Sequence, residues 1–164
     1  NWGFKYFDKK TNLENNVINS RLETIKNKLL FKESFDTRKC IIPANGYYEW
    51  LTRDNIKMPY FIHIPDKESI YFAGVWKYLD FKKSTSKVFS IITKPANNLL
   101  KEIHERMPVA LSAEESKDYL DHNSSNYLIN NVQLILDEYF EFFKISKFVN
   151  NPINNSSECI KPIK

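Results

Sequence analysis

Residues 38–50, RKCIIPANGYYEW, carry the clearest structural signal in this sequence. Two runs rich in β-branched and aromatic residues, KCIIP and YYEW, flank the short polar stretch ANG. Asn-Gly between two apolar runs is a strong signal for a β-hairpin. We therefore predict a strand, a turn around Gly46 and a second strand.

Further strands are predicted on the C-terminal side of this segment. Short aromatic and β-branched runs cover residues 60–64, 70–76 and 88–93, and the turn-forming stretch PDKES separates the first two. Such runs favour extended backbone, because branched and aromatic side chains pack well on a pleated surface. One more strand is predicted over residues 142–148.

Helices are predicted around these strands. Apolar residues recur at helical spacing over 23–35 and 132–139, and a helix is expected over 96–104. Ser112 and Glu115 have the spacing of a capping box, which predicts a helix that continues through Leu120. Antiparallel strands interrupted by short helices indicate an α+β fold. The polar segment 150–164 is expected to lie over the surface as an extended tail.

Length and composition restrict the class of protein. The 164 residues suit one domain, and 42% apolar with 15% aromatic content is enough to fill a core. Only three glycines are present, which excludes a Walker A loop and a dinucleotide fingerprint, so we expect no nucleotide cofactor. No apolar run approaches the roughly 20 residues that span a bilayer, so no membrane partner is expected. The chain begins at Asn1, and both methionines are internal, so we expect a segment to precede it.

Charge and cysteine content indicate the compartment and the partners. The formal net charge is +4, which permits nucleic-acid binding without requiring it. Cys40 and Cys159 lie far apart in the sequence, so there is no zinc or thioredoxin spacing and no metal is expected. Two cysteines fit no disulfide-rich secreted scaffold. A reducing, cytoplasmic setting is therefore expected, and richness in Lys, Asn and Ile suggests a bacterial source.

Two strand-associated positions could carry chemistry. Glu49 lies between Tyr48 and Trp50, so its carboxylate is either a solvated charge or a partly desolvated acid/base group. Strand alternation places Tyr48 with Trp50 on one face, and Tyr47 with Glu49 on the other. Thr93 ends a predicted strand, where a hydroxyl or a backbone amide can be presented.

Two further candidates flank predicted helices. Asn19, Ser20 and Arg21 precede the first one, where Asn and Ser are also ordinary N-caps. His104 and Arg106 stand at the exit of another, before Pro108, and histidine can move protons near neutral pH. His63 and His122 are interpreted as structural or solvated.

Cys40 is a possible nucleophile of a Cys–His–Asn hydrolase with His104 and Asn19. It precedes Ile41 and Ile42 in a predicted strand, and apolar surroundings raise the pKa of a thiol. A buried structural role is therefore favoured for Cys40.

Eight short motifs follow one another along the chain: WGF (2–4), INSRLET (18–24), RKCIIPANGYYEW (38–50), MPYFI (58–62), FAGVW (72–76), FSIITKPAN (89–97), IHERMPVAL (103–111) and ISKFVNN (145–151). Taken in this order, they resemble those of the SOS response-associated peptidase (SRAP) family, whose members process abasic sites in DNA. The resemblance implies one SRAP domain over residues 1–164 that lacks its N-terminal segment. It also implies a mainly antiparallel, partly barrel-like sheet with short peripheral helices.

The resemblance further implies a function. The family's nucleophile is a cysteine directly after the initiator methionine, and this chain does not include it. The implied catalytic residues are Asn19, Glu49 and His104, and the implied DNA-binding residues are Arg21, Trp50, Thr93 and Arg106. The implied activity is covalent crosslinking to abasic sites in single-stranded DNA as a thiazolidine, with autoproteolysis of the N-terminus, by a cytoplasmic monomer without cofactor. Two alternatives stay open: a non-covalent module that binds single-stranded or damaged DNA, and a Cys40-dependent peptidase.

Overall fold

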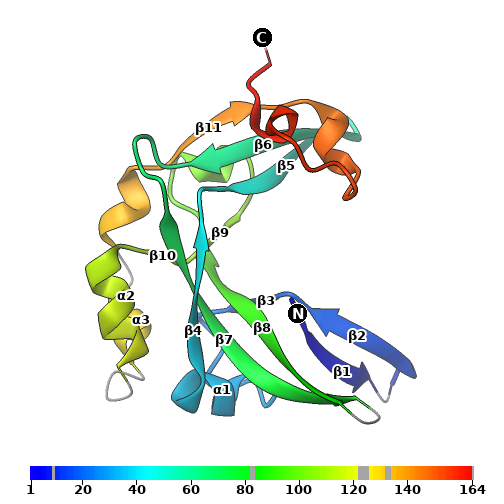
Figure 1. The fold of residues 1–164 in the computed structure, drawn as a ribbon, viewed down its shortest axis with the longest axis vertical. Helices are drawn as coiled ribbons and strands as arrows, with labels where there is room; N and C mark the ends of the chain where they lie inside the picture. The colour runs from blue at the N-terminus through cyan, green and yellow to red at the C-terminus, as the bar shows by residue number, and fades with distance from the viewer. Residues whose placement is uncertain (9, 82–83, 122–125, 132–133, 164) are drawn as a thin grey trace.

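The computed structural model describes residues 1–8, 10–81, 84–121, 126–131 and 134–163. Within these ranges the strands form three sheets (Figure 1). A six-stranded sheet comprises β3 (Asn19–Arg21), β4 (Lys39–Ala44), β7 (Ile70–Phe81), β8 (Ser84–Pro95), β9 (Arg106–Pro108) and β10 (Ala110–Leu111). A three-stranded sheet comprises β5 (Tyr47–Arg53), β6 (Ile56–His63) and β11 (Glu141–Lys144), and a hairpin pairs β1 (Phe4–Asp8) with β2 (Leu13–Val17).

The α+β prediction is confirmed, since the sheets are mostly antiparallel and the helices are short. The α-helices are α1 (Lys32–Thr37), α2 (Ala113–Leu120) and α3 (Tyr127–Asn130). Single 3-10 turns cover Leu100–Glu102, Ile135–Glu138, Lys147–Asn150 and Ser157–Ile160. Figure 1 shows α2 and α3 on the outside of the long, curled sheet that β7 and β8 form. None of the helices in the described ranges is long and apolar enough to cross a membrane.

The predicted hairpin around Gly46 is wrong, although both of its strands exist. Strand β4 pairs with β7, whereas β5 pairs with β6, so the chain passes from one sheet to another at Asn45-Gly46. The hairpin turn is instead Asp54-Asn55, where φ is +50° and +63°. Two successive positive φ angles are what a two-residue type I′ turn requires. Gly46 is needed for close packing, because a Cβ there would lie 2.4 Å from the Phe61 ring.

Several predicted helices are shorter than expected. Of residues 23–35 only the end is helical, in α1, and the preceding residues form successive turns that bury Leu22, Ile25 and Phe31. The segments 96–104 and 134–139 contain single 3-10 turns rather than helices, while residues 132–133 lie outside the described residues, as does His122. Helix α2 is confirmed together with its capping box, in which Ser112 N donates to the Glu115 carboxylate at 2.8 Å.

The C-terminal part differs from the sequence prediction in two respects. Strand β11 ends at Lys144, and a 3-10 turn follows it, so the strand predicted over 142–148 is only half formed. The final segment contains a further 3-10 turn that buries Cys159, and Ile163 N donates to Lys144 O at 3.0 Å. This segment is therefore fastened to β11 rather than simply extended.

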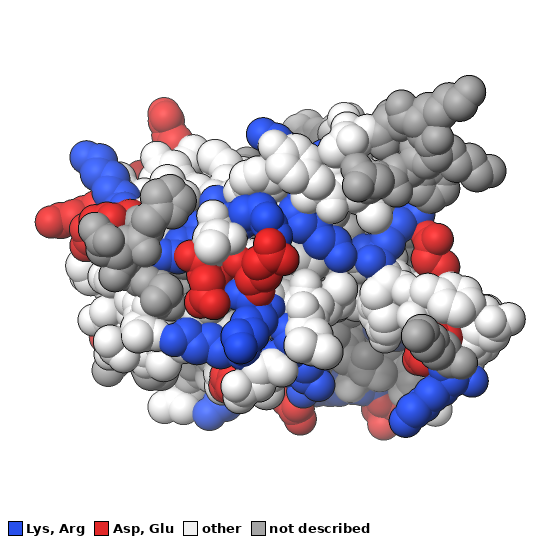
Figure 2. Space-filling view, turned by 90° about the horizontal axis from the view of Figure 1, so that it is seen from below, with Lys and Arg blue, Asp and Glu red and all other residues white. Residues whose placement is uncertain are grey.

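Two apolar clusters stabilise the fold. One packs α1, α2 and the N-terminal segments against the six-stranded sheet and includes Phe4, Ile25 and Tyr119. The other lies where the six-stranded and three-stranded sheets meet, and it includes Ile62, Phe72 and Met107. Burial of apolar surface is the main favourable term in folding, so both junctions are fixed in place. Figure 2 shows that Lys and Arg side chains on the lower face form a band with acidic side chains among them.

Candidate active site

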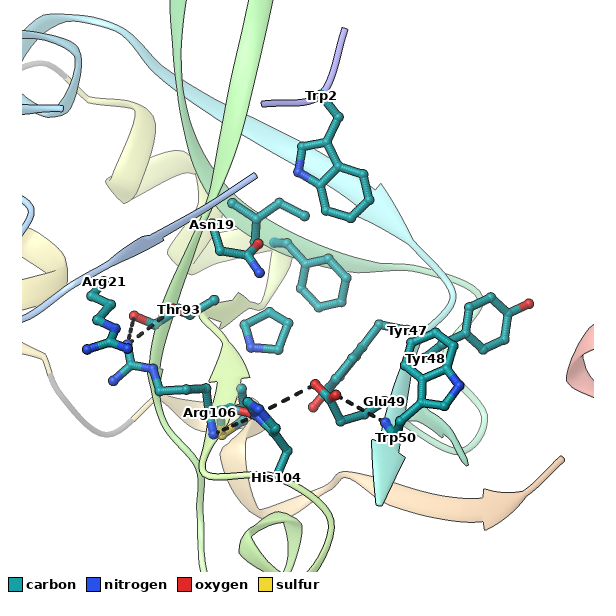
Figure 3. Close-up of a pocket in the computed structure, with 14 residues that line it drawn as sticks. Trp2, Asn19, Arg21, Tyr47, Tyr48, Glu49, Trp50, Thr93, His104 and Arg106 are labelled. Carbon is teal, nitrogen blue, oxygen red and sulfur yellow. Dashed lines mark hydrogen bonds and ion pairs between the residues drawn. The ribbon is translucent and has the colours of Figure 1, made fainter. Parts of the chain in front are cut away.

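A pocket of about 690 Å³ opens where β5 faces the ends of β3, β8 and β9 (Figure 3). It brings together residues from segments that are far apart in the sequence. All seven predicted site residues line it: Asn19, Arg21, Glu49, Trp50, Thr93, His104 and Arg106. The remaining lining residues are Trp2, Tyr47, Tyr48, Phe72, Ile91, Met107 and Pro108.

Strand β3 presents Asn19 and Arg21 to this pocket. It pairs in parallel with β8, with Asn19 opposite Ile91 and Arg21 opposite Thr93. Side chains alternate along a strand, so Asn19 and Arg21 share one face while Ser20, 1% exposed, points into the core. Asn19 is therefore a strand residue, and the alternative of an N-cap is wrong here, since α1 begins only at Lys32.

Thr93 and Arg106 are fixed by each other. The Arg106 NH2 group donates to Thr93 O at 2.7 Å and to Thr93 Oγ1 at 3.2 Å. The same guanidinium forms two contacts with Glu23, at 2.5 Å from NH1 to Oε1 and 3.0 Å from NH2 to Oε2. The hydrogen bond from Arg106 is the main cause that lowers the pKa of Glu23.

Glu49 and His104 meet across the mouth of the pocket. The distance from Glu49 Oε2 to His104 Nδ1 is 3.7 Å, and the side chains are 25% and 46% exposed. Figure 3 shows Glu49 pointing toward His104, while the Trp50 indole points away from it, in line with strand alternation. His104 Nδ1 also accepts a hydrogen bond from Arg106 N at 3.0 Å, which holds the ring at the mouth of the pocket.

Trp50 is held by a residue from the C-terminal part of the chain. Its Nε1–H donates to Asn150 Oδ1 at 2.8 Å. A second hollow, of about 490 Å³, shares Glu49, Trp50 and His104 with the pocket and adds Lys57 and Asn150. The open surface therefore continues past Glu49 and His104 along β5 and β6.

Sequence reasoning missed part of the pocket wall. Trp2 stacks on Phe89 with ring centroids 6.2 Å apart, and its Nε1–H donates to Ile18 O at 2.9 Å. Tyr47 packs edge-on against Phe72, and burial raises the pKa of the Tyr47 hydroxyl. Trp2 belongs to the WGF motif and Phe72 to the FAGVW motif, so both carried a family signal, although neither motif indicated that its aromatic residue lines this pocket.

Cys40 does not line the pocket. It lies in β4, and burial raises the pKa of its thiol to about 12. A thiol with so high a pKa is almost entirely protonated at neutral pH and is a poor nucleophile. The structure therefore gives no support to a peptidase that uses Cys40. Within the described residues, no group of three or more His, Cys, Asp and Glu side chains could hold a metal ion.

Comparison with known proteins gives consistent matches. A family model described as SOS response associated peptidase (SRAP) matches residues 1–152. The abasic site processing proteins YoqW and YoaM of Bacillus subtilis are 34% and 35% identical to the chain. Each match covers 88% of this chain and 66% or 65% of the relative, so the chain spans just under two thirds of their length. The crystal structure of a protein from Bacteroides thetaiotaomicron has a TM-score of 0.82 at 26% identity, covering 99% of this chain and 75% of that one.

Proposed function

This chain belongs to the SOS response-associated peptidase family, and on that premise we propose that it processes abasic sites in single-stranded DNA by bonding to them covalently. One observation carries the proposal: the seven residues expected from the family motifs line a single pocket, with Glu49 and His104 3.7 Å apart. Relatives named as abasic site processing proteins support the choice of substrate.

The proposed nucleophile is an N-terminal cysteine that precedes these residues in the protein. An abasic sugar equilibrates with an open-chain aldehyde. The cysteine amine adds to the aldehyde carbon, and loss of one water gives an imine. The thiol then adds across the C=N bond and closes a five-membered thiazolidine, with the proton passing to nitrogen. Neither Cys40 nor Cys159 lines the pocket, so neither is proposed as this nucleophile.

Three residues would act on the reacting atoms. We assign to Glu49 and His104 the transfer of protons between the sugar oxygen, the amine and the imine. Proton transfer by positioned groups is typically worth 10²–10⁴-fold in rate. Asn19 lies on the same pocket wall as Arg21 and would orient the amine or the carbonyl oxygen by hydrogen bonding.

The remaining site residues would hold the strand. Arg21 and Arg106 are suited to phosphates, because a guanidinium binds two oxygens at once. Trp50 offers an aromatic face for stacking, which is worth about 1–3 kcal/mol per base and tolerates any sequence. Thr93 supports this edge of the pocket through its contacts with Arg106. We further propose that the protein removes its own N-terminal methionine by hydrolysis and acts as a monomer in the bacterial cytoplasm.

The test uses the full-length protein with its N-terminal cysteine and a single-stranded oligonucleotide that carries one abasic site. We expect an adduct that survives denaturing electrophoresis. It should be absent when the N-terminal cysteine is alanine and should form about 10²-fold more slowly in Glu49→Gln. An oligonucleotide with a tetrahydrofuran analogue, which has no aldehyde, serves as the matched negative substrate.

The same experiment separates the alternatives. Salt-dependent binding of the oligonucleotide without any adduct would contradict covalent processing and would favour a non-covalent DNA-binding module. A Cys40-dependent peptidase would instead cleave a peptide substrate and lose this cleavage in Cys40→Ala with full retention of the fold. The high pKa of the Cys40 thiol instead predicts unchanged adduct formation in that variant.

A further inference from the structure

The Arg106 guanidinium already holds an anion in this structure. Its NH1 and NH2 groups contact the two oxygens of Glu23, at 2.5 and 3.0 Å. This is the two-pronged geometry that guanidinium groups use for carboxylates and for phosphates alike. The carboxylate therefore occupies the position that a DNA phosphate would need on the outer edge of Arg106.

The other edge of this guanidinium is not available either. NH2 also donates to Thr93 O and Thr93 Oγ1, at 2.7 and 3.2 Å. Nε is buried and has no hydrogen-bond partner among the described residues. With Glu23 in place, Arg106 has no pair of free N–H groups to offer to a phosphate.

We propose that Glu23 occupies the phosphate position on Arg106 and is exchanged for a phosphate when the abasic strand binds. This inference rests on the proposed function, and it makes Glu23 a residue that sets DNA affinity and selectivity by acting through Arg106. The exchange requires that the Glu23 side chain can move away while Arg106 stays in place. The Glu23 side chain is 43% exposed and can turn into water, whereas Arg106 is 21% exposed and stays attached to Thr93.

The charges around Glu23 fit the same role. Arg21 also lowers the pKa of Glu23, after the larger effect of Arg106, so the carboxylate lies in the field of both arginines. A carboxylate tethered this close acts at a high effective concentration. A lone phosphate that makes no other contact competes poorly with it. A strand that also enters the pocket and stacks on Trp50 gains enough additional contacts to displace it.

The test measures equilibrium binding of a fluorescent single-stranded oligonucleotide that carries a tetrahydrofuran abasic analogue, which binds without bonding. The full-length protein is compared with Glu23→Gln, Glu105→Gln, Arg106→Gln and the double variant Glu23→Gln/Arg106→Gln. Glu105→Gln is the matched control, because it removes the same charge from the exposed residue next to Arg106. Thermal unfolding of each variant checks that the fold is retained.

We expect Glu23→Gln to bind about two- to fivefold more tightly than the unsubstituted protein, which is the range for partly exposed ion pairs. Glu105→Gln should change affinity less, and the gain from Glu23→Gln should vanish when Arg106 is already Gln. Weaker binding by Glu23→Gln, or a gain equal to that of the control, would overturn the inference and leave the proposed function standing. Absence of binding in every protein would overturn both.

Discussion

Gly46→Ala tests whether the corner between β4 and β5 positions Glu49, the proposed acid/base partner of His104. The added Cβ would lie 2.4 Å from Phe61 Cζ and 2.5 Å from Ile62 O. Ordinary contacts between heavy atoms begin near 3.5 Å, so a ring and a backbone carbonyl must each retreat by about 1 Å. Overpacking of this kind costs about 1–3 kcal/mol. In a protein of this size each kcal/mol lowers the melting temperature by about 2–4 °C, so we expect a fall of about 2–12 °C.

The displacement of Phe61 and Ile62 should also change the position of Glu49 and so slow the proposed reaction. Gly46 directly precedes β5, which carries Glu49, and its obstructing neighbours lie in β6, the partner strand of β5. A misplacement of about 1 Å can cost on the order of 10²-fold in rate, so adduct formation with abasic DNA should fall further than stability alone explains. Melting is measured by differential scanning calorimetry, and the adduct by denaturing electrophoresis below the melting temperature.

The adjacent residue provides the control for this substitution. Asn45 is exposed, and Asn45→Ala should melt close to the unsubstituted protein, because the corner depends on close packing at Gly46 and not on an Asn-Gly hairpin turn. A melting temperature of Gly46→Ala within about 1 °C of the unsubstituted protein would refute the packing argument. An equal loss of stability in both variants would also contradict it, because the exposed Asn45 would then matter as much as Gly46.

Three further substitutions or treatments test other parts of the structure. Cys40 should resist iodoacetamide at pH 8, because a pKa of about 12 leaves the thiolate in only about one molecule in 10⁴. Its rate of labelling should rise about tenfold per pH unit toward that pKa. Peptide mass mapping after a few minutes at pH 8 should find Cys40 unlabelled. Asp137→Asn should lower the free energy of unfolding in urea by about 3–5 kcal/mol, because it removes a buried carboxylate that pairs with Lys94; a loss below 1 kcal/mol would contradict this. Asn150→Ala should weaken binding of abasic single-stranded DNA about fivefold, the equivalent of one hydrogen bond of about 1 kcal/mol to Trp50, with unchanged affinity as the opposing result.

The sequence predicted the strands well, because extended backbone is favoured by the branched and aromatic residues of the strand itself. Branched and aromatic runs formed β5, β6, β7 and β8, and the capping box at Ser112 formed α2 as expected. The predicted pairing of β4 with β5 was wrong because strand pairing is not decided locally. An Asn-Gly step permits a hairpin, but packing of residues distant in sequence decides which strands pair, and Gly46 is pressed against β6.

For the candidate site, too, the sequence indicated single residues but not the contacts between them. The motifs indicated Asn19, Glu49 and His104 one by one, yet nothing local indicated that β3 would pair with β8 or that His104 would lie 3.7 Å from Glu49. The partnership of Glu23 with Arg106 was also invisible, because Glu23 lay inside a stretch with helical spacing. Contacts between segments that lie far apart in sequence depend on the completed sheet.

The parallel pairing of β3 with β8 has a consequence for the time at which the pocket forms. The hydrogen bond from Ser20 to Ile91 spans 71 residues, and closing so long a loop is slow compared with forming a local turn. At synthesis rates of about 5–20 residues per second, the strand that carries Asn19 waits about 4–14 s before its partner has been made. His104 and Arg106 emerge from the ribosome later still. A nascent chain therefore has no partial pocket, and the groups that would act on DNA come together only after most of the domain has been synthesised.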